Sequence, residues 1–259
     1  MKTKTILEKI IKFKQVETEK RKTFTPLESF IDKISGKKKD FKASLKKDGI
    51  SIIAEIKRNS PSRGLLRDNF NHISIAKEYE KGGASAISVL TDAKYFWGNN
   101  NHLIDVKKEI NLPILRKEFI IDEYQIYQSA YIGADAILLI AKILQLKQLI
   151  KFLDLAKELN MACLVEVHSK EELQKVFATS AEIIGINNRN LENFQTSIEH
   201  SLNLKKLIPE KYITVSESGI KKREDIIALE EAGFHSVLIG ETLIKQTDIE
   251  KKLKELLGK

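Results

Sequence analysis

Eight short apolar stretches recur along the chain at a nearly even interval, and several of them end in a lysine, glutamate, asparagine or glycine. The mean distance between their starts is about 26 residues, which is the length of one strand, one helix and two loops. This interval predicts a series of β/α units. The stretches span residues 52–56, 86–90, 113–115, 136–140, 162–165, 183–186, 212–215 and 236–239.

Amphipathic segments with helical periodicity lie between these stretches, at residues 73–81, 123–132, 146–159, 170–178 and 222–232. Gly82-Gly83, Gly133 and Gly233 follow three of them, where a left-handed cap residue is expected. Strictly alternating strands and helices predict a parallel sheet. Eight repeats favour closure into a (β/α)8 TIM barrel. An open doubly wound sheet is the weaker alternative, because no Gly-x-Gly-x-x-Gly turn follows any strand.

The first 49 residues precede the barrel and are predicted to be helical. Ile6, Ile10, Ile11 and Phe13 form a rough apolar face, and Pro26 is placed as in the first turn of a second helix. The lysines at 37–39 are expected to be solvated surface. We therefore expect one domain, in which a helical extension (1–49) packs on a catalytic barrel (50–259).

The composition is that of a globular protein without membrane segments, with 42% hydrophobic and 31% charged residues. The longest apolar run, 136–141, ends at Lys142, far short of the roughly 18 residues of a spanning helix. The N-terminus lacks the apolar core of a signal peptide, and the single cysteine, Cys163, cannot form an intrachain disulfide. These features predict a cytoplasmic protein.

The net charge of +8 comes mostly from lysines mixed with glutamates, as in residues 251–256. This pattern indicates a solvated surface more than a nucleic-acid interface, although a positive field also attracts anionic substrates.

Side-chain parity predicts where the reactive residues meet. In a TIM barrel, alternate residues face the lumen, and the carboxyl ends of the strands surround the active site. Glu55 and Lys57 share one face of the first strand, while Ala54 and Ile56 face the helices. The same choice of face gathers these strand-end residues at one rim: Lys117, Glu166, Asn187 and Glu217, with Arg189 two residues further on. The alternative is a set of salt bridges that plug the barrel, but desolvating so many charges without a ligand is costly.

Glycines at the ends of the last two strands suggest a phosphate site, in which backbone N–H groups and a helix N-terminus bind a dianion. The candidates are Ser218, Gly219, Gly240 and Glu241, although the Glu241 carboxylate must turn away from a bound phosphate. Ordinary turns into helices remain an alternative. The polar loop at 59–64 is either a plain turn or a mobile lid.

Short motifs recur at the strand ends and loops of the predicted barrel: AEIKRNSPS (54–62), SVLTD (88–92) with Tyr95-Phe96, LRKEF (115–119), VEVH (165–168), GINNRNL (185–191) and SESGI (216–220). In order and spacing, over about 200 residues, these motifs resemble the indole-3-glycerol phosphate synthase family of tryptophan biosynthesis. Two departures are Glu118, where the family usually has Asp, and Trp97-Gly98-Asn99, where it has smaller residues.

The resemblance implies a lyase that converts 1-(2-carboxyphenylamino)-1-deoxyribulose 5-phosphate to indole-3-glycerol phosphate, releasing CO2 and water without a cofactor or metal. It implies that Lys117 is the general acid of ring closure and that Glu166 acts as acid or base in dehydration. Lys57 would engage the anthranilate carboxylate or help in proton transfer, and Glu55 would orient the lysines. The resemblance also implies that Asn187 and Glu217 contact the sugar hydroxyls and that Arg189 contacts the carboxylate. The residues implied around the phosphate are Ser60, Ser218, Gly219, Gly240 and Glu241. Those implied around the aromatic ring are Phe96, Phe119 and Leu191.

A small phosphate ester is thus the expected partner, with no nucleic acid, no membrane and no second subunit. The nearest alternative is phosphoribosylanthranilate isomerase, but its chemistry looks for a cysteine base on the first strand, whereas Cys163 lies on the fifth and faces the helices. A nucleic-acid module should carry arginine clusters, and only 7 arginines occur. A metal hydrolase is disfavoured because the histidines are scattered and fit surface or core positions better. They are His72, His102, His168, His200 and His235.

Overall fold

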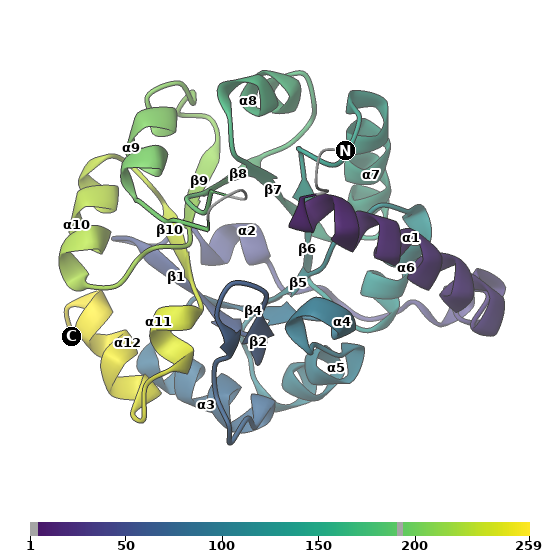
Figure 1. The fold of residues 1–259 in the computed structure, drawn as a ribbon, viewed down its shortest axis with the longest axis horizontal. Helices are drawn as coiled ribbons and strands as arrows, with labels where there is room; N and C mark the ends of the chain where they lie inside the picture. The colour runs from purple at the N-terminus through teal and green to yellow at the C-terminus, as the bar shows by residue number, and fades with distance from the viewer. Residues whose placement is uncertain (1–4, 191–193) are drawn as a thin grey trace.

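The computed structural model describes residues 5–190 and 194–259, in which eight parallel strands close into a barrel (Figure 1). The prediction of a TIM barrel preceded by a helical segment is confirmed. In chain order the barrel strands are β1 (Ser51–Ile56), β4 (Ala86–Leu90), β5 (Ile114–Lys117), β6 (Ala136–Ile140), β7 (Ala162–Val167), β8 (Ile183–Asn187), β9 (Ile213–Glu217) and β10 (Ser236–Ile239).

Four strands extend beyond the apolar stretches and include the charged or amide residue at their end. Lys117 pairs with Leu90, Glu166 with Ile140, and Asn187 with Glu217 in the ladders between neighbouring strands. Because their backbones belong to the sheet, these side chains are held in fixed directions at the barrel rim.

The outer layer consists of helices that follow the strands. α3, α6, α7, α8 and α10 lie within a residue or two of the predicted segments, and Gly83, Gly133 and Gly233 have φ values of 94°, 92° and 80°. α5 and α9 were not predicted, since both carry few apolar residues. The helices after β1 are α3 (His72–Gly82), α4 (Ala93–Phe96), α5 (Asn100–Glu109), α6 (Glu123–Tyr131), α7 (Leu146–Glu158), α8 (Lys170–Phe177), α9 (Glu199–Lys205), α10 (Arg223–Glu231), α11 (Glu241–Ile244) and α12 (Ile249–Leu257).

Apolar side chains form two clusters, one between the strands and the helices and one in the barrel lumen. Ala54 and Ile56 belong to the outer cluster, as parity predicts, and Cys163 packs against it. The lumen is filled by alternate residues such as Leu115, Leu164 and Val215. Apolar side chains therefore fill the lumen below the rim, and charged groups gather at its carboxyl-terminal mouth.

The N-terminal segment contacts both ends of the barrel. It consists of α1 (Ile6–Phe24), the 3₁₀ helices η1 (Leu27–Ser29) and η2 (Ile31–Lys33), and α2 (Phe41–Ser44). α2 is seen inside the ring of strands in Figure 1, and Phe41 and Leu45 join the lumen cluster, so this segment closes the end opposite the rim. Pro26 does not start an α-helix: it caps a single 3₁₀ turn, because Phe30 with φ −139° interrupts the helical path.

The expectation of a fully solvated lysine run at 37–39 is wrong for two of its three residues. Lys38 Nζ donates to the Ala130 carbonyl and Lys39 Nζ to the Ile110 carbonyl, both at 2.9 Å. These carbonyls lie at the C-terminal ends of α6 and α5, where the last helical carbonyls favour a cation. Burial lowers the pKa of both lysines.

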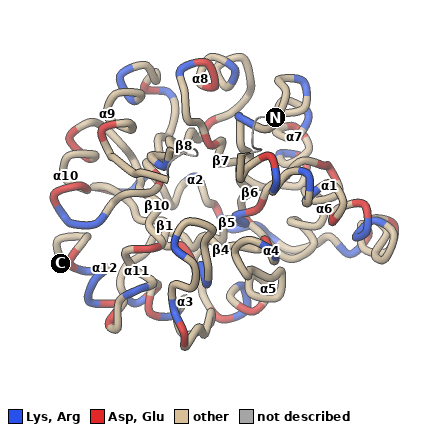
Figure 2. The backbone as a smooth tube through the Cα atoms, viewed as in Figure 1, with Lys and Arg blue, Asp and Glu red and all other residues tan. Residues whose placement is uncertain are grey.

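The loop after β1 forms a small antiparallel hairpin of β2 (Asn59–Ser60) and β3 (Gly64–Leu65). Asn59 is buried, and its side-chain amide donates to the Tyr95 carbonyl at 2.9 Å. The hairpin is thereby tied to α4 at the edge of the barrel mouth. On the outer helices, basic and acidic residues are interspersed, as Figure 2 shows, and pairs such as Lys254–Glu250 agree with a solvated surface.

Candidate active site

A cavity of about 370 Å³ opens at the carboxyl-terminal mouth of the barrel. Active sites of TIM barrels lie at this end. Leu191, one of the residues that the sequence singles out, lies outside the described residues. The others all line the cavity: Glu55, Lys57, Ser60, Phe96, Lys117, Phe119, Glu166, Asn187, Arg189, Glu217, Ser218, Gly219, Gly240 and Glu241.

Lys117 lies between two carboxylates at the centre of this cavity. Its Nζ donates to Glu166 Oε2 at 2.8 Å and to Glu217 Oε2 at 2.9 Å. Glu166 is 4% exposed and Glu217 only 1%. The salt-bridge alternative is thus partly correct, but these ion pairs line an open cavity instead of filling the lumen.

Electrostatic interactions give the three groups different protonation preferences. Burial disfavours the Lys117 ammonium, but the carboxylates of Glu166, Glu217 and Glu55 outweigh burial and raise its pKa. Burial also disfavours the Glu166 carboxylate, yet Lys117 and then His168 lower its pKa. Burial dominates at Glu217, where it raises the pKa despite Lys117. Glu217 is therefore the carboxylate that retains a proton more readily.

Two glycines make room for the carboxylates of the rim. A Cβ atom on Gly185 would lie 2.2 Å from Glu217 Oε1, and one on Gly240 would lie 2.3 Å from Glu55 Oε1. In the space left by Gly240, Glu55 accepts a 2.5 Å hydrogen bond from Lys57 Nζ. The glycine signal at 240 therefore has a packing cause besides any role in anion binding.

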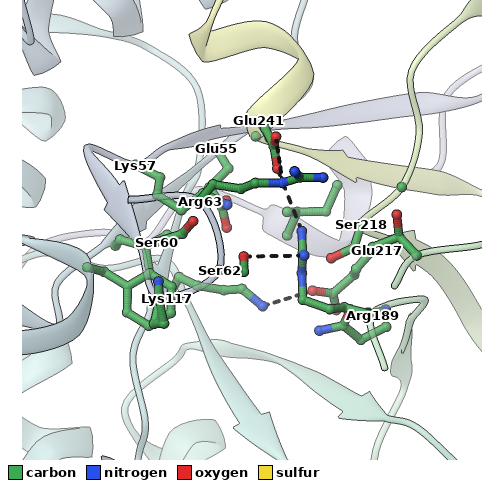
Figure 3. Close-up of a pocket in the computed structure, with 18 of the residues that line it drawn as sticks. Glu55, Lys57, Ser60, Ser62, Arg63, Lys117, Arg189, Glu217, Ser218 and Glu241 are labelled. Carbon is green, nitrogen blue, oxygen red and sulfur yellow. Dashed lines mark hydrogen bonds and ion pairs between the residues drawn. The ribbon is translucent and has the colours of Figure 1, made fainter. Parts of the chain in front are cut away.

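A second charged cluster crosses the mouth of the cavity (Figure 3). Glu241 lies 3.5 Å from Arg63 Nε, 3.8 Å from Arg189 Nη2 and 2.6 Å from Lys245 Nζ. Arg189 also donates to the Phe194 carbonyl at 3.2 Å. The Glu241 carboxylate thus lies among cations from the hairpin, from the loop after β8 and from the residue that follows α11.

Comparison with known proteins shows the family to which this chain belongs. The family model of indole-3-glycerol phosphate synthase matches residues 7–256. A synthase of that name from Alkaliphilus metalliredigens is 46% identical over 254 residues, which is 97% of each chain. Another from Caldanaerobacter subterraneus is 46% identical over 98% of each chain.

The chain belongs to the indole-3-glycerol phosphate synthase family. As a member of this family, the protein is a lyase of tryptophan biosynthesis (EC 4.1.1.48). Among solved structures, a mutant tryptophan synthase α-subunit from Pyrococcus furiosus matches with a TM-score of 0.61. That match covers 81% of this chain and 98% of the other at 16% identity, so it shows the fold alone.

Because the chain belongs to the synthase family, the phosphoribosylanthranilate isomerase alternative is excluded. The position of Cys163 agrees with this conclusion. Cys163 faces the helix layer, and burial raises the pKa of its thiol to about 12.

Among the described residues, no group of three or more His, Cys, Asp or Glu is arranged to hold a metal ion. In the same part of the chain, no helix is long and apolar enough to span a membrane.

At the departure Glu118, the carboxylate contacts a buried lysine that the sequence did not reveal. Lys14 of α1 is 2% exposed and lies 3.0 Å from Glu118 Oε1 and 2.9 Å from Asp92 Oδ2. Glu118 Oε1 also accepts the Phe119 N–H at 2.8 Å, so this carboxylate points away from Lys117. The other departure, Trp97-Gly98, is a tight turn: Trp97 has φ 53°, and a Cβ on Gly98 would lie 2.4 Å from the Leu90 carbonyl oxygen.

Part of the apolar wall of the synthase cavity was also missed. Phe96 and Phe119 lie with ring centroids 6.0 Å apart, and Ile6, Leu7 and Ile10 of α1 complete the lining. The apolar face of α1 was visible in the sequence, but nothing in the sequence showed that it reaches the active site across the barrel rim.

Proposed function

We propose that the cavity binds 1-(2-carboxyphenylamino)-1-deoxyribulose 5-phosphate with its aromatic ring against Phe96 and Phe119 and its phosphate near Ser218 and Gly219. Leu191 is the third proposed contact of the ring. Phe96 and Phe119 follow β4 and β5, whereas Ser218 and Gly219 follow β9, which lies across the barrel from β5. This separation suits a substrate with a ring at one end and a dianion at the other.

Lys117 is proposed as the general acid of ring closure. A bond forms between the carboxylate-bearing ring carbon and the ribulose carbonyl carbon, and the carbonyl oxygen takes the Lys117 proton to become a hydroxyl. The carboxylate then leaves as CO2, and its bonding electrons restore the aromatic ring. The two carboxylates beside Lys117 raise its pKa and so keep it in the protonated form that a general acid requires.

Glu166 is proposed as the base of the dehydration that follows. The new hydroxyl takes a proton, for which Lys57 is the proposed donor, and leaves as water, while Glu166 removes a proton from the five-membered ring to form the indole. The low pKa of Glu166 supports the base role over the acid role, because an ionised carboxylate accepts a proton. Lys57, oriented by Glu55, is placed to engage the substrate carboxylate or to assist proton transfer.

The remaining contacts are proposed to bind and orient the substrate. Asn187 and Glu217 face the centre of the cavity and suit sugar hydroxyls, while Arg189 suits the anthranilate carboxylate. Ser218 and Gly219 have φ values of 69° and 83°, a conformation that turns successive N–H groups toward an anion. Ser60 and Gly240 complete the proposed phosphate site, beside the cations that now hold Glu241.

The observation that carries this mechanism is the position of Lys117 between Glu166 and Glu217. Lys117→Met should lower kcat by about 100- to 10,000-fold, the range expected for loss of a general acid. Product formation is followed by indole fluorescence, and binding of indole-3-glycerol phosphate by calorimetry. Binding should persist, because the ring and phosphate contacts remain. Turnover of Lys117→Met near the wild-type rate would exclude Lys117 as the acid.

We further propose that the enzyme acts as a cytoplasmic monomer. The lack of any possible intrachain disulfide and a biosynthetic role on a small phosphorylated substrate support this setting. Sedimentation of the purified protein tests the monomer directly.

A further inference from the structure

His168 lies at the border between the active-site cavity and a second, larger cavity. It follows Glu166 by two residues on the same face of the chain after β7, and its side chain is 11% exposed. The ring lines both the active-site cavity and an outer cavity of about 940 Å³. A histidine in this position separates Glu166 from the outer cavity.

The His168 ring is flanked by carboxylates on both sides. Nε2 lies 3.6 Å from Glu166 Oε1, and Nδ1 lies 3.7 Å from Glu172 Oε2. Both nitrogens are buried, and neither has a hydrogen-bond partner among the residues that the structure describes. Such gaps are common in ligand-free active sites and close when the substrate binds.

We propose that His168 is a positioning residue for Glu166, which it orients from the outer side as Lys117 does from the inner side. This inference rests on the proposed role of Glu166 as a base. Glu166 directs Oε2 to Lys117 and Oε1 to His168, so each oxygen has a cationic partner. A carboxylate held at both oxygens keeps one direction, which a proton transfer requires.

The charges around His168 favour its imidazolium form. Burial opposes that form, but the carboxylates of Glu172 and Glu166, at 3.7 Å and 3.6 Å from the two ring nitrogens, outweigh burial and raise the pKa of His168. Glu217 of β9 also raises the pKa of His168, but more weakly. His200 of α9, when charged, repels the His168 imidazolium. The remaining charged residues around the shared outer cavity are Arg63, Lys142, Arg189 and Lys221.

The proposal predicts a basic limb in the pH profile of kcat. Because the imidazolium is the effective form, kcat should fall as pH rises through the pKa of His168, which lies above its usual value near 6.5. In His168→Gln, kcat should drop by about 10- to 100-fold with KM nearly unchanged, and this limb should disappear.

Glu172→Gln supplies a second, independent test. Glutamine retains an acceptor for the His168 backbone N–H, which Glu172 now accepts at 2.7 Å, but it removes the charge that raises the pKa of His168. The basic limb should therefore move to lower pH. His235→Gln is the matched control, because His235 contacts Thr214 at the opposite end of the barrel. In His235→Gln the basic limb of the kcat profile should lie at the same pH as in the wild type.

A basic limb that persists unchanged in His168→Gln, or that does not move in Glu172→Gln, would overturn the proposal. If His168→Gln does not fold, as judged by circular dichroism, the Glu172→Gln profile decides alone. Glu166→Gln separates the two proposals. Wild-type turnover of Glu166→Gln would exclude Glu166 as the base. If Glu166→Gln is inactive but His168→Gln has the kcat and pH profile of the wild type, only the role of His168 is excluded.

Discussion

At the scale of single residues, the absence of two side chains is as important as the presence of the charged ones. Gly185 of β8 and Gly240 after β10 lie beside the carboxylates of Glu217 and Glu55, at distances that leave no space for a methyl group. Cores of this density respond to a single added carbon. The positions of the acidic groups are therefore set by neighbouring strands as well as by their own.

Gly185→Ala should displace Glu217 and lower kcat by about 10- to 100-fold, since small misplacements of active-site groups have effects of this size. Glu217→Ala and the double variant complete the cycle. If the methyl group acts through Glu217, the double variant should be no slower than Glu217→Ala alone. Additive losses in kcat would show that Gly185→Ala acts by another route.

Which residues could be predicted from sequence depended on how far their partners lie along the chain. Parity placed Lys117 and Glu166 on one rim because a strand alternates strictly, and that rule needs no knowledge of contacts. His168 obeys the same parity, but its environment depends on Glu172 of α8 and on a cavity formed by several loops. Lys14 lies on a helix whose docking the sequence did not reveal.

At the scale of secondary structure, α1 is attached to the barrel by a buried ion cluster. Lys14 lies 2.6 Å from Glu17, 2.9 Å from Asp92 and 3.0 Å from Glu118. Burial disfavours its charge, but Glu118 and Asp92 outweigh burial and raise its pKa. We propose that this cluster joins residues 1–49 to the barrel 50–259 as one domain.

Lys14→Met should lower the free energy of unfolding by about 3–5 kcal/mol, because it removes the closest cation of the buried carboxylates of Asp92 and Glu118 and leaves Glu118 only Arg116, at 3.9 Å. Lys12→Met, an exposed position on the same helix, is the control and should change stability by less than about 0.5 kcal/mol. Urea unfolding followed by circular dichroism measures both. Equal effects of the two substitutions would contradict a specific role of Lys14.

The strands and most helices were predictable because their signals are local. The strand interval and the helix-capping glycines follow from the sequence periodicity alone. Among the segments that were missed, α5 and α9 carry few apolar residues, and the path after Pro26 is interrupted at Phe30. Tertiary contacts, such as those of α5 with α3, hold these segments in place. Local propensity is a weak guide for such segments.

At the scale of the whole molecule, the net charge of +8 should attract an anionic substrate. Raising salt from about 0.01 M to about 0.15 M shortens the screening length from about 30 Å to about 8 Å. kcat/KM should then fall several-fold for the phosphorylated substrate, mainly through KM. A dephosphorylated substrate should bind far more weakly and depend less on salt. Equal salt dependence for both substrates would argue against attraction of the phosphate.

The ring of strands is completed by its first and last members, and this has a consequence during synthesis on the ribosome. β1 pairs with β10, and the Ser236 hydroxyl donates to the Ser51 carbonyl across 185 residues of chain. A nascent chain therefore keeps one edge of β1 without its partner until almost the whole protein has emerged. Unpaired edges recruit other strands, so we expect chaperone dependence to be greatest just before translation ends.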